Sequence, residues 1–278
     1  MYKLMVWSVT VIWGISFIAT RVVVNSIPPL TAALIRFMIA SLTLVILSRG
    51  KIKDFLSKDV IFAGFWGVTA YFVFENSGLV FTYPTNASLI ISSAPILYTI
   101  FSHLIQKRKT TMKEYLASFL AFTGVAIIIL NGRFILKLNP FGDFLMLGAA
   151  LSWVFYTYHI DRIKDGDSLS IIVSITIWGS IFLIPFSIFE KKNDLSLDFK
   201  TLISLLYLSI VCSGIAYFFW NTGIKRINPR YTTNTIYFIP LVTSVADSII
   251  LKNFPNFYTV LGGLTVLSGL WILNNSRK

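Results

Sequence analysis

The chain has 278 residues, of which 55% are hydrophobic and only 13% are charged, and its mean hydropathy is +0.74. Soluble globular proteins carry about 25% charged residues, so this composition excludes a soluble fold, and the high hydrophobicity excludes disorder. The net charge of +12 does not indicate nucleic acid, because the positive residues lie in short loops between apolar runs, as in membrane proteins. The single cysteine, Cys212, excludes an intrachain disulfide and a cysteine-based zinc site.

Ten apolar runs approach the length of about 20 residues that a helix needs to cross a hydrocarbon core of about 30 Å. They cover residues 4–24, 30–47, 60–80, 86–104, 114–130, 140–159, 169–189, 202–224, 231–251 and 257–273. Their continuity favours helices over the strands of a barrel, in which polar and apolar residues would alternate. Proline-containing turns separate several of the runs, so we expect ten transmembrane helices joined by short loops.

The distribution of positive charge predicts the orientation of these helices. With the N-terminus in the cytoplasm, sixteen Lys and Arg residues fall in inner loops, seven fall in outer loops and Arg36 lies within a run. Cytoplasmic loops of membrane proteins are enriched in Lys and Arg. We therefore expect a multi-pass protein of the plasma membrane with both termini in the cytoplasm, in contact with the lipid bilayer and not with nucleic acid.

When the sequence is shifted by 145 residues, its second part aligns with its first part without a gap. We call this register the internal alignment. The matched pairs are Asn76 with Asn221, Pro84 with Pro229, Pro95 with Pro240, and Gly124 with Gly269. A slightly shorter shift, of 140 residues, also places Trp13 on Trp153. We predict two halves of five runs each, residues 1–137 and 138–278. Because five is odd, the second half would be inverted in the membrane, as in secondary transporters that hold a solute between two inverted repeats.

Together these features predict an all-α integral membrane protein of ten transmembrane helices, built as two inverted five-helix repeats around a central cavity. Short motifs then carry a resemblance to a known family: Trp13-Gly14-Ile15-Ser16-Phe17, Arg36-Phe37, Pro95-Ile96-Leu97, Leu151-Ser152-Trp153, Ala216-Tyr217-Phe218-Phe219-Trp220-Asn221 and Pro240-Leu241. In this order and spacing, the chain resembles the EamA family of the drug/metabolite transporter superfamily over essentially its whole length. The resemblance implies ten helices, a central cavity and the movement of small organic solutes, often amino acids or other metabolites, outward.

Glu75 is the first candidate site residue, because a charge inside an apolar helix costs several kcal/mol unless it faces a cavity or a partner. It can couple transport to protons, anchor a substrate ammonium, or be an interfacial carboxylate roughly 8 Å from the helix end. Trp220 stands at the matching position of the second half. Arg36 lies about 10 Å into the second run and can either bind a substrate carboxylate or pin helix ends.

Polar and aromatic residues complete the candidate site. Asn76 and Asn221 can bind a solute or form hydrogen bonds between helices. Aromatic side chains supply apolar area and cation–π attraction, or simply pack; those selected are Trp13, Tyr71, Trp153, Tyr156, Tyr217 and Trp220. Pro95 and Pro240 each remove a helix hydrogen bond and can act as gating hinges or as static kinks.

The predicted function is a secondary transporter that exports small organic metabolites, such as amino acids or amines, by alternating access. A zwitterion or amine is favoured over a phosphate-rich solute because Arg36 is the one Lys or Arg well inside a run, Arg21 lying at the outer end of the first run. The alternative is an intramembrane enzyme acting on a lipid or a small amphipathic substrate. No cofactor or metal is expected, since the sequence has no His-rich cluster, paired-aspartate motif or phosphate-binding loop. Coupling to protons stays open, and His159 with the charged residues after it is expected to be solvated.

Overall fold

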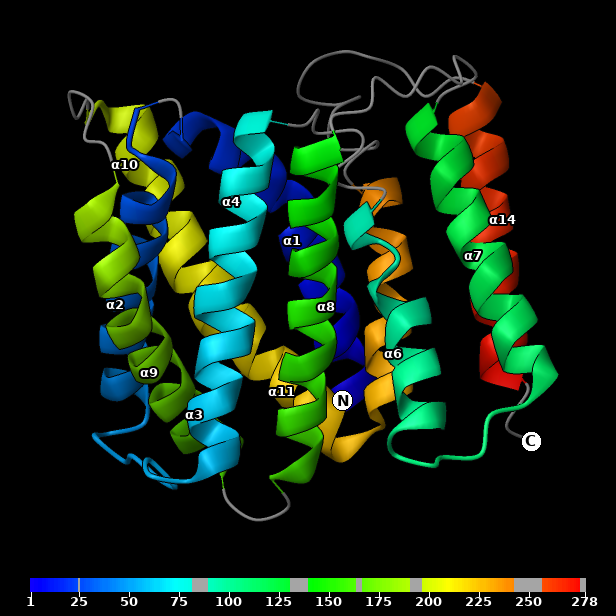
Figure 1. Cartoon of the computed structure of the whole chain (residues 1–278), viewed down its shortest axis with the longest axis horizontal. Helices are drawn as coiled ribbons and strands as arrows, with labels where there is room; N and C mark the ends of the chain where they lie inside the picture. The colour runs from blue at the N-terminus through cyan, green and yellow to red at the C-terminus, as the bar shows by residue number, and fades with distance from the viewer. Residues whose placement is uncertain are drawn as a thin grey trace.

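The computed structural model describes residues 1–24, 26–81, 90–130, 140–163, 167–190, 197–242 and 257–275. Within these ranges every regular element is a helix and there is no strand. Figure 1 shows the helices standing side by side and crossing one common layer from its lower to its upper end. Helices suit a bilayer because each satisfies its own backbone hydrogen bonds.

The helical elements follow the predicted runs closely. Those of the first half are α1 (Tyr2–Val24), α2 (Pro29–Leu47), α3 (Lys58–Gly64), the π-helix η1 (Phe65–Ala70), α4 (Tyr71–Phe81), α6 (Ala94–Leu104) and α7 (Met112–Leu130). Those of the second half are α8 (Pro140–Arg162), α9 (Ser168–Phe189), α10 (Phe199–Leu206), the π-helix η2 (Tyr207–Ile215), α11 (Ala216–Arg226), α12 (Pro229–Asn234), the 3₁₀-helix η3 (Thr235–Phe238) and α14 (Phe257–Asn275). Each predicted run is therefore helical over most of its described part.

The lipid-facing character of the bundle is visible in its composition. Three helices in the described ranges are long and apolar enough to cross a membrane: α2, α9 and the continuous helix Phe199–Arg226. Large apolar side chains also cover the outside, among them Leu42, Phe119 and Trp271, which are 63%, 65% and 68% exposed. An exposed apolar surface of this kind fits lipid better than water. The expected all-helical membrane protein is confirmed, whereas the number of spans stays a prediction.

Two π-helices interrupt matching runs. The internal alignment places η1 on residues 210–215, inside η2. A π-bulge changes the regular hydrogen-bond ladder of a helix and is frequent at functional sites. The Gly67 carbonyl of η1 accepts a hydrogen bond from the Tyr217 hydroxyl at 3.0 Å, and the matching Cys212 carbonyl of η2 accepts one from the Trp13 indole at 3.1 Å. Each of these two bonds joins one half of the chain to the other.

The two candidate hinge prolines follow matching interruptions. Pro95 lies in the first turn of α6, directly after a turn at residues 92–93, and Pro240 follows η3. The turn at residues 92–93 falls on residues 237–238, the end of η3, in the internal alignment. A proline at the start of a helix removes no needed donor, because the first turn has no intrahelical acceptor for its N–H groups. Both prolines therefore restart helices that are already interrupted.

α7 and α14 form a close pair at the right edge of Figure 1 and run in opposite directions. A Cβ atom added at Gly124 would lie 2.6 Å from the Val266 amide nitrogen, and one added at Gly269 would lie 2.7 Å from the Ala121 amide nitrogen. Only glycine allows this backbone approach. The internal alignment places Gly124 on Gly269 and Ala121 on Val266, so the contact is reciprocal.

Candidate functional site

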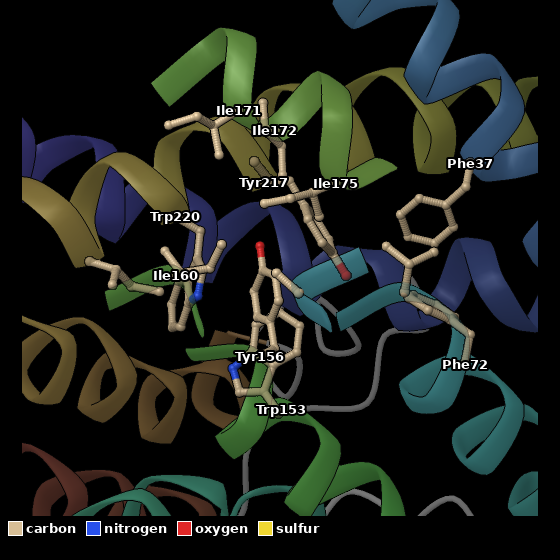
Figure 2. Packing of buried hydrophobic residues seen from close by; sticks show 14 of the residues in the cluster. Phe37, Phe72, Trp153, Tyr156, Ile160, Ile171, Ile172, Ile175, Tyr217 and Trp220 are labelled. Atoms are coloured by element: carbon tan, nitrogen blue, oxygen red, sulfur yellow. The ribbon is translucent and has the colours of Figure 1, made fainter. Parts of the chain in front are cut away.

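The aromatic side chains predicted for the site meet in the core of the bundle. Trp13 of α1, Trp153 of α8 and Trp220 of α11 form a triangle with ring centroids 5.0 to 5.7 Å apart. The Tyr156 ring lies 5.0 Å from Trp153, and the Tyr217 ring lies 5.8 Å from Trp13. Figure 2 shows four of these side chains converging from α8 and α11. We call these five residues the aromatic cluster; it joins the first half of the chain to the second.

Helix geometry explains how α8 and α11 supply the cluster. Trp153 and Tyr156 are three residues apart, as are Tyr217 and Trp220, so each pair lies on one face of its helix. Asn221 supports this arrangement, since its Nδ2 donates to the Tyr156 hydroxyl at 2.8 Å and to the Tyr217 carbonyl at 2.7 Å. Tyr156 and Trp220 are fully buried. The rings contact one another directly, so the cluster is closed in this conformation.

Glu75 lies beside the cluster on α4. Tyr71, one turn earlier, donates a hydrogen bond from its hydroxyl to Glu75 Oε1 at 3.2 Å. The Tyr71 ring also lies 5.3 Å from the Trp153 ring. Glu75 is half-buried. A carboxylate is thereby connected to the aromatic cluster through a single tyrosine.

Arg36 of α2 lies close to the same carboxylate. Its side chain is 8% exposed, and its Nε donates to the Ser213 hydroxyl of η2 at 2.5 Å. The guanidinium lies 4.9 Å from the centre of the Phe72 ring, within the range of a cation–π contact. Arg36 is also near enough to Glu75 for the two charges to interact. One positive and one negative side chain therefore share this part of the bundle.

A small cleft lies beside Arg36, between the last turns of α1 and the first turns of α2. Its cavity volume is about 20 Å³, room for about one water molecule, and it is lined from α1, α2, α4, α10 and η2. Arg36, Asn76 and Thr20 supply its polar side chains, and the remaining lining is apolar. Asn76 donates to the Pro29 carbonyl at 2.9 Å, which ties α4 to the start of α2. The matched asparagines thus have different partners, since Asn221 supports the aromatic cluster.

Side chains join α3 to α8 at the lower end of the bundle in Figure 1. Asp59 of α3 lies 2.8 Å from His159 Nδ1 and accepts a hydrogen bond from Arg162 Nε at 3.1 Å. The His159 ring also stacks on Phe62 with centroids 5.3 Å apart. His159 is thus engaged with α3 and not solvated as expected, because α3 brings an acidic residue to the end of α8.

A buried arginine makes a second connection at the lower end. Arg230 of α12 is 6% exposed and donates to the Ser102 hydroxyl at 2.9 Å, the Lys109 carbonyl at 2.9 Å and the Thr110 hydroxyl at 2.7 Å. Its guanidinium also lies 3.6 Å from the Glu114 carboxylate. These contacts join α12 of the second half to the connection between α6 and α7 of the first.

The upper end has a comparable connection. Glu190, directly after α9, accepts hydrogen bonds from the Leu30 and Thr31 amides of α2 at 2.8 Å each. The Thr31 hydroxyl donates to the same carboxylate at 2.9 Å. A carboxylate satisfies the free amides at a helix N-terminus and interacts favourably with the helix dipole. Glu190 therefore holds α9 against α2 at the end opposite Arg230.

The structure brings all ten predicted binding residues into one connected region. It also adds residues that the sequence analysis missed. Phe37 lies between Phe72 and Tyr217, at 5.0 and 5.7 Å from their rings. The internal alignment could have identified Phe72, because it places Phe72 on Tyr217, a predicted site residue. Ser213, the partner of Arg36, had no such signal. No three His, Cys, Asp or Glu side chains gather as a metal site among the described residues.

The chain is similar to known transporters over nearly its whole length. The sequence model of the EamA-like transporter family matches residues 2–130 and 140–275. An uncharacterised transporter of Archaeoglobus fulgidus is 29% identical over 272 residues, covering 94% of this chain and 93% of its own. A protein of Escherichia coli named a probable amino-acid metabolite efflux pump is 25% identical over 282 residues, covering 95% and 91%.

A solved crystal structure with 17% sequence identity has the same fold. Its TM-score is 0.86, and the match covers 99% of this chain and 98% of the other. The names of the sequence relatives indicate a transporter and not an enzyme. The chain therefore belongs to the EamA-like transporter family, as its motifs predicted.

Proposed function

We propose that this protein is a secondary transporter that exports small organic metabolites, such as amino acids or amines, by alternating access. The observation that carries the proposal is the aromatic cluster between the two halves, with Glu75 and Arg36 beside it. Aromatic faces attract both apolar groups and cations. The name of the Escherichia coli relative, a probable amino-acid metabolite efflux pump, supports this class of solute.

The charges assign a role to each side of the solute. Glu75 anchors an ammonium group, since it lies next to aromatic rings and is oriented by Tyr71. Arg36 lines the cleft and attracts a carboxylate as the solute passes. A single arginine among these residues suits a zwitterion or an amine better than a phosphate-rich solute. Proton binding at Glu75 is the alternative role for that side chain.

The proposed architecture is two inverted repeats, residues 1–137 and 138–278, within ten transmembrane helices. Matching π-helices and matching interruptions before Pro95 and Pro240 support the repeat. The reciprocal contact of Gly124 and Gly269 across antiparallel helices supports a twofold axis perpendicular to those helices. The family model also matches one stretch within each half. An axis in the membrane plane is the arrangement of inverted repeats in secondary transporters.

The proposed cycle starts from the conformation seen here. With both termini in the cytoplasm of a plasma-membrane protein, the lower end is the inner one, and Arg230 and Asp59 hold it closed. The cleft at Arg36 then faces outward. Pro95 and Pro240 lie beside interrupted helices that can serve as hinges while the two ends open in turn.

Flux into liposomes that contain only this protein tests the function. We expect saturable counterflow of at least one member of a panel of labelled amino acids and amines, and none in protein-free liposomes. The absence of flux for every member of the panel would overturn the proposal. Conversion of added phospholipid in the same liposomes would instead support the intramembrane enzyme.

A further inference from the structure

Two of the three tryptophans in the aromatic cluster bury a polar group without a partner. The indole N–H groups of Trp153 and Trp220 have no hydrogen-bond acceptor among the described residues, although these side chains are only 5% and 0% exposed. Trp13 differs, because its indole donates to the Cys212 carbonyl at 3.1 Å. Buried donors in proteins are rarely left unpaired, because the lost hydrogen bond to water is not replaced.

The neighbouring polar groups are already engaged with one another. The Tyr156 hydroxyl pairs with the Asn221 side chain at 2.8 to 2.9 Å, and the Tyr217 hydroxyl donates to the Gly67 carbonyl. The rings of Trp153 and Trp220 are 5.7 Å apart, and Figure 2 shows their nitrogen-bearing edges turned toward the space between them. Two donors therefore adjoin one small, otherwise apolar region.

We propose that Trp153 and Trp220 determine solute specificity by donating their indole hydrogen bonds to an acceptor oxygen of the transported solute, a carboxylate in the first place. The inference rests on the transport function proposed above and narrows its substrate class. An indole N–H is a donor without acceptor capacity, so it selects for acceptor groups. Hydrogen bonds to an ionised oxygen are about twice as strong as those to a neutral one. Solutes with both a carboxylate and an ammonium are therefore preferred over simple amines.

The position of the Glu75 carboxylate determines the orientation of the bound solute. Tyr71 contacts both Trp153 and Glu75, so an ammonium site and an acceptor site adjoin through one side chain. Glu75 belongs to the first half, whereas Trp153 and Trp220 belong to the second. The ammonium of a bound zwitterion thus points to the first half and its carboxylate to the second. Arg36, which interacts with Glu75 and Ser213, serves the approach through the cleft.

Paired probes test this inference directly. Counterflow and binding are measured with L-leucine against 3-methylbutylamine, and with L-phenylalanine against 2-phenylethylamine, since each pair differs only by the carboxylate. We expect Trp153→Phe and Trp220→Phe each to weaken apparent affinity for the amino acids about tenfold and to leave the amines within about twofold. Trp13→Phe is the matched control, and it should change both members of a pair equally because its N–H is already bonded within the protein.

The outcomes separate this inference from the transport function. Equal losses for amino acids and amines in Trp153→Phe and Trp220→Phe would overturn the acceptor site while leaving the transporter intact. Wild-type flux of amines alone would also overturn it. No wild-type flux of any probe would overturn the transport function itself. If a phenylalanine variant does not fold, the unaltered protein decides the matter: affinity should fall from L-leucine to its methyl ester to 3-methylbutylamine, and any other order contradicts the proposal.

Discussion

Glu75 on α4 and Trp220 on α11 occupy matching positions of the two halves, yet they contribute different chemistry. Glu75 brings a carboxylate, held by Tyr71, whereas Trp220 brings a buried ring with an unpaired donor among the described residues. The backbones around them are alike, since both positions follow a π-helix. The comparison teaches that packing preserves the shared backbone while the side chains of the candidate site are free to differ. Substitutions at matched positions should therefore have equal effects where the two halves make the same contact, and unequal effects where their side chains differ.

The largest effects are expected where the halves are equivalent. Gly124→Val and Gly269→Val should each lower the free energy of unfolding by about 2–3 kcal/mol, because the added side chain meets the backbone of the opposite helix. The two losses should be similar, as the contact is reciprocal. Thermal unfolding in detergent measures both.

Gly263→Val on α14 is the milder control, since its Cβ would meet the end of the flexible Leu241 side chain. A large loss in one variant of the matched pair and none in the other would show that the two contacts are not equivalent.

A large effect on transport is expected where the halves differ. Glu75→Gln keeps the shape of the side chain but removes its charge, so exchange and gradient-driven uptake should both fall at least tenfold, or about 1.4 kcal/mol, if the carboxylate holds an ammonium. Tyr71→Phe, which removes only the supporting hydrogen bond, should cost less. Both fluxes are measured in liposomes at two pH values.

The pattern of loss decides the role of Glu75. Loss of gradient-driven uptake with intact exchange would assign a proton to this carboxylate, because exchange needs no net proton movement. Changes smaller than about twofold in both fluxes correspond to a negligible difference in barrier height and would remove Glu75 from the site.

Smaller effects are expected at the two bonds to the π-helices. Tyr217→Phe and Trp13→Phe each leave a carbonyl, Gly67 or Cys212, without its side-chain donor, so each should reduce stability by about 1 kcal/mol. Thermal unfolding of the single and double variants measures this. Non-additive losses are expected, since the Trp13 and Tyr217 rings lie 5.8 Å apart and neighbouring residues couple energetically. If only one variant is destabilised, the two π-helices do not play equivalent parts.

The sequence was sufficient to predict an all-helical membrane protein and a group of residues that the structure brings together. Apolar runs marked the helices, because a bilayer demands long apolar segments whatever their partners. Internal symmetry then selected Trp13, Trp153, Asn221 and Trp220 from a chain rich in aromatic residues. The structure places the three tryptophans in contact, and Asn221 donates to the Tyr217 carbonyl beside them. Symmetry succeeds here because matched positions of two packed halves face the same interior.

The unpredicted features all depend on contacts between distant segments. The π-helices, the Ser213 partner of Arg36 and the buried Arg230 have no periodic signal in the sequence. His159 was expected in solvent because its own segment is polar, but Asp59 approaches it from α3. The composition of a segment predicts its own polarity, but it does not predict which distant segment packs against it.

The close pairing of α7 with α14 has a consequence for biosynthesis. Leu130 ends α7, and α14 begins only at Phe257, so the chain must extend by most of its second half before the partner helix exists. At a synthesis rate of about 5–20 residues per second, α7 waits roughly 10 s in the bilayer with its face of small residues, Ala117, Ala121 and Gly124, against lipid. Any nascent chain that stalls before residue 257 therefore presents an unpaired helix, which is a recognisable mark of an unfinished molecule for membrane quality control.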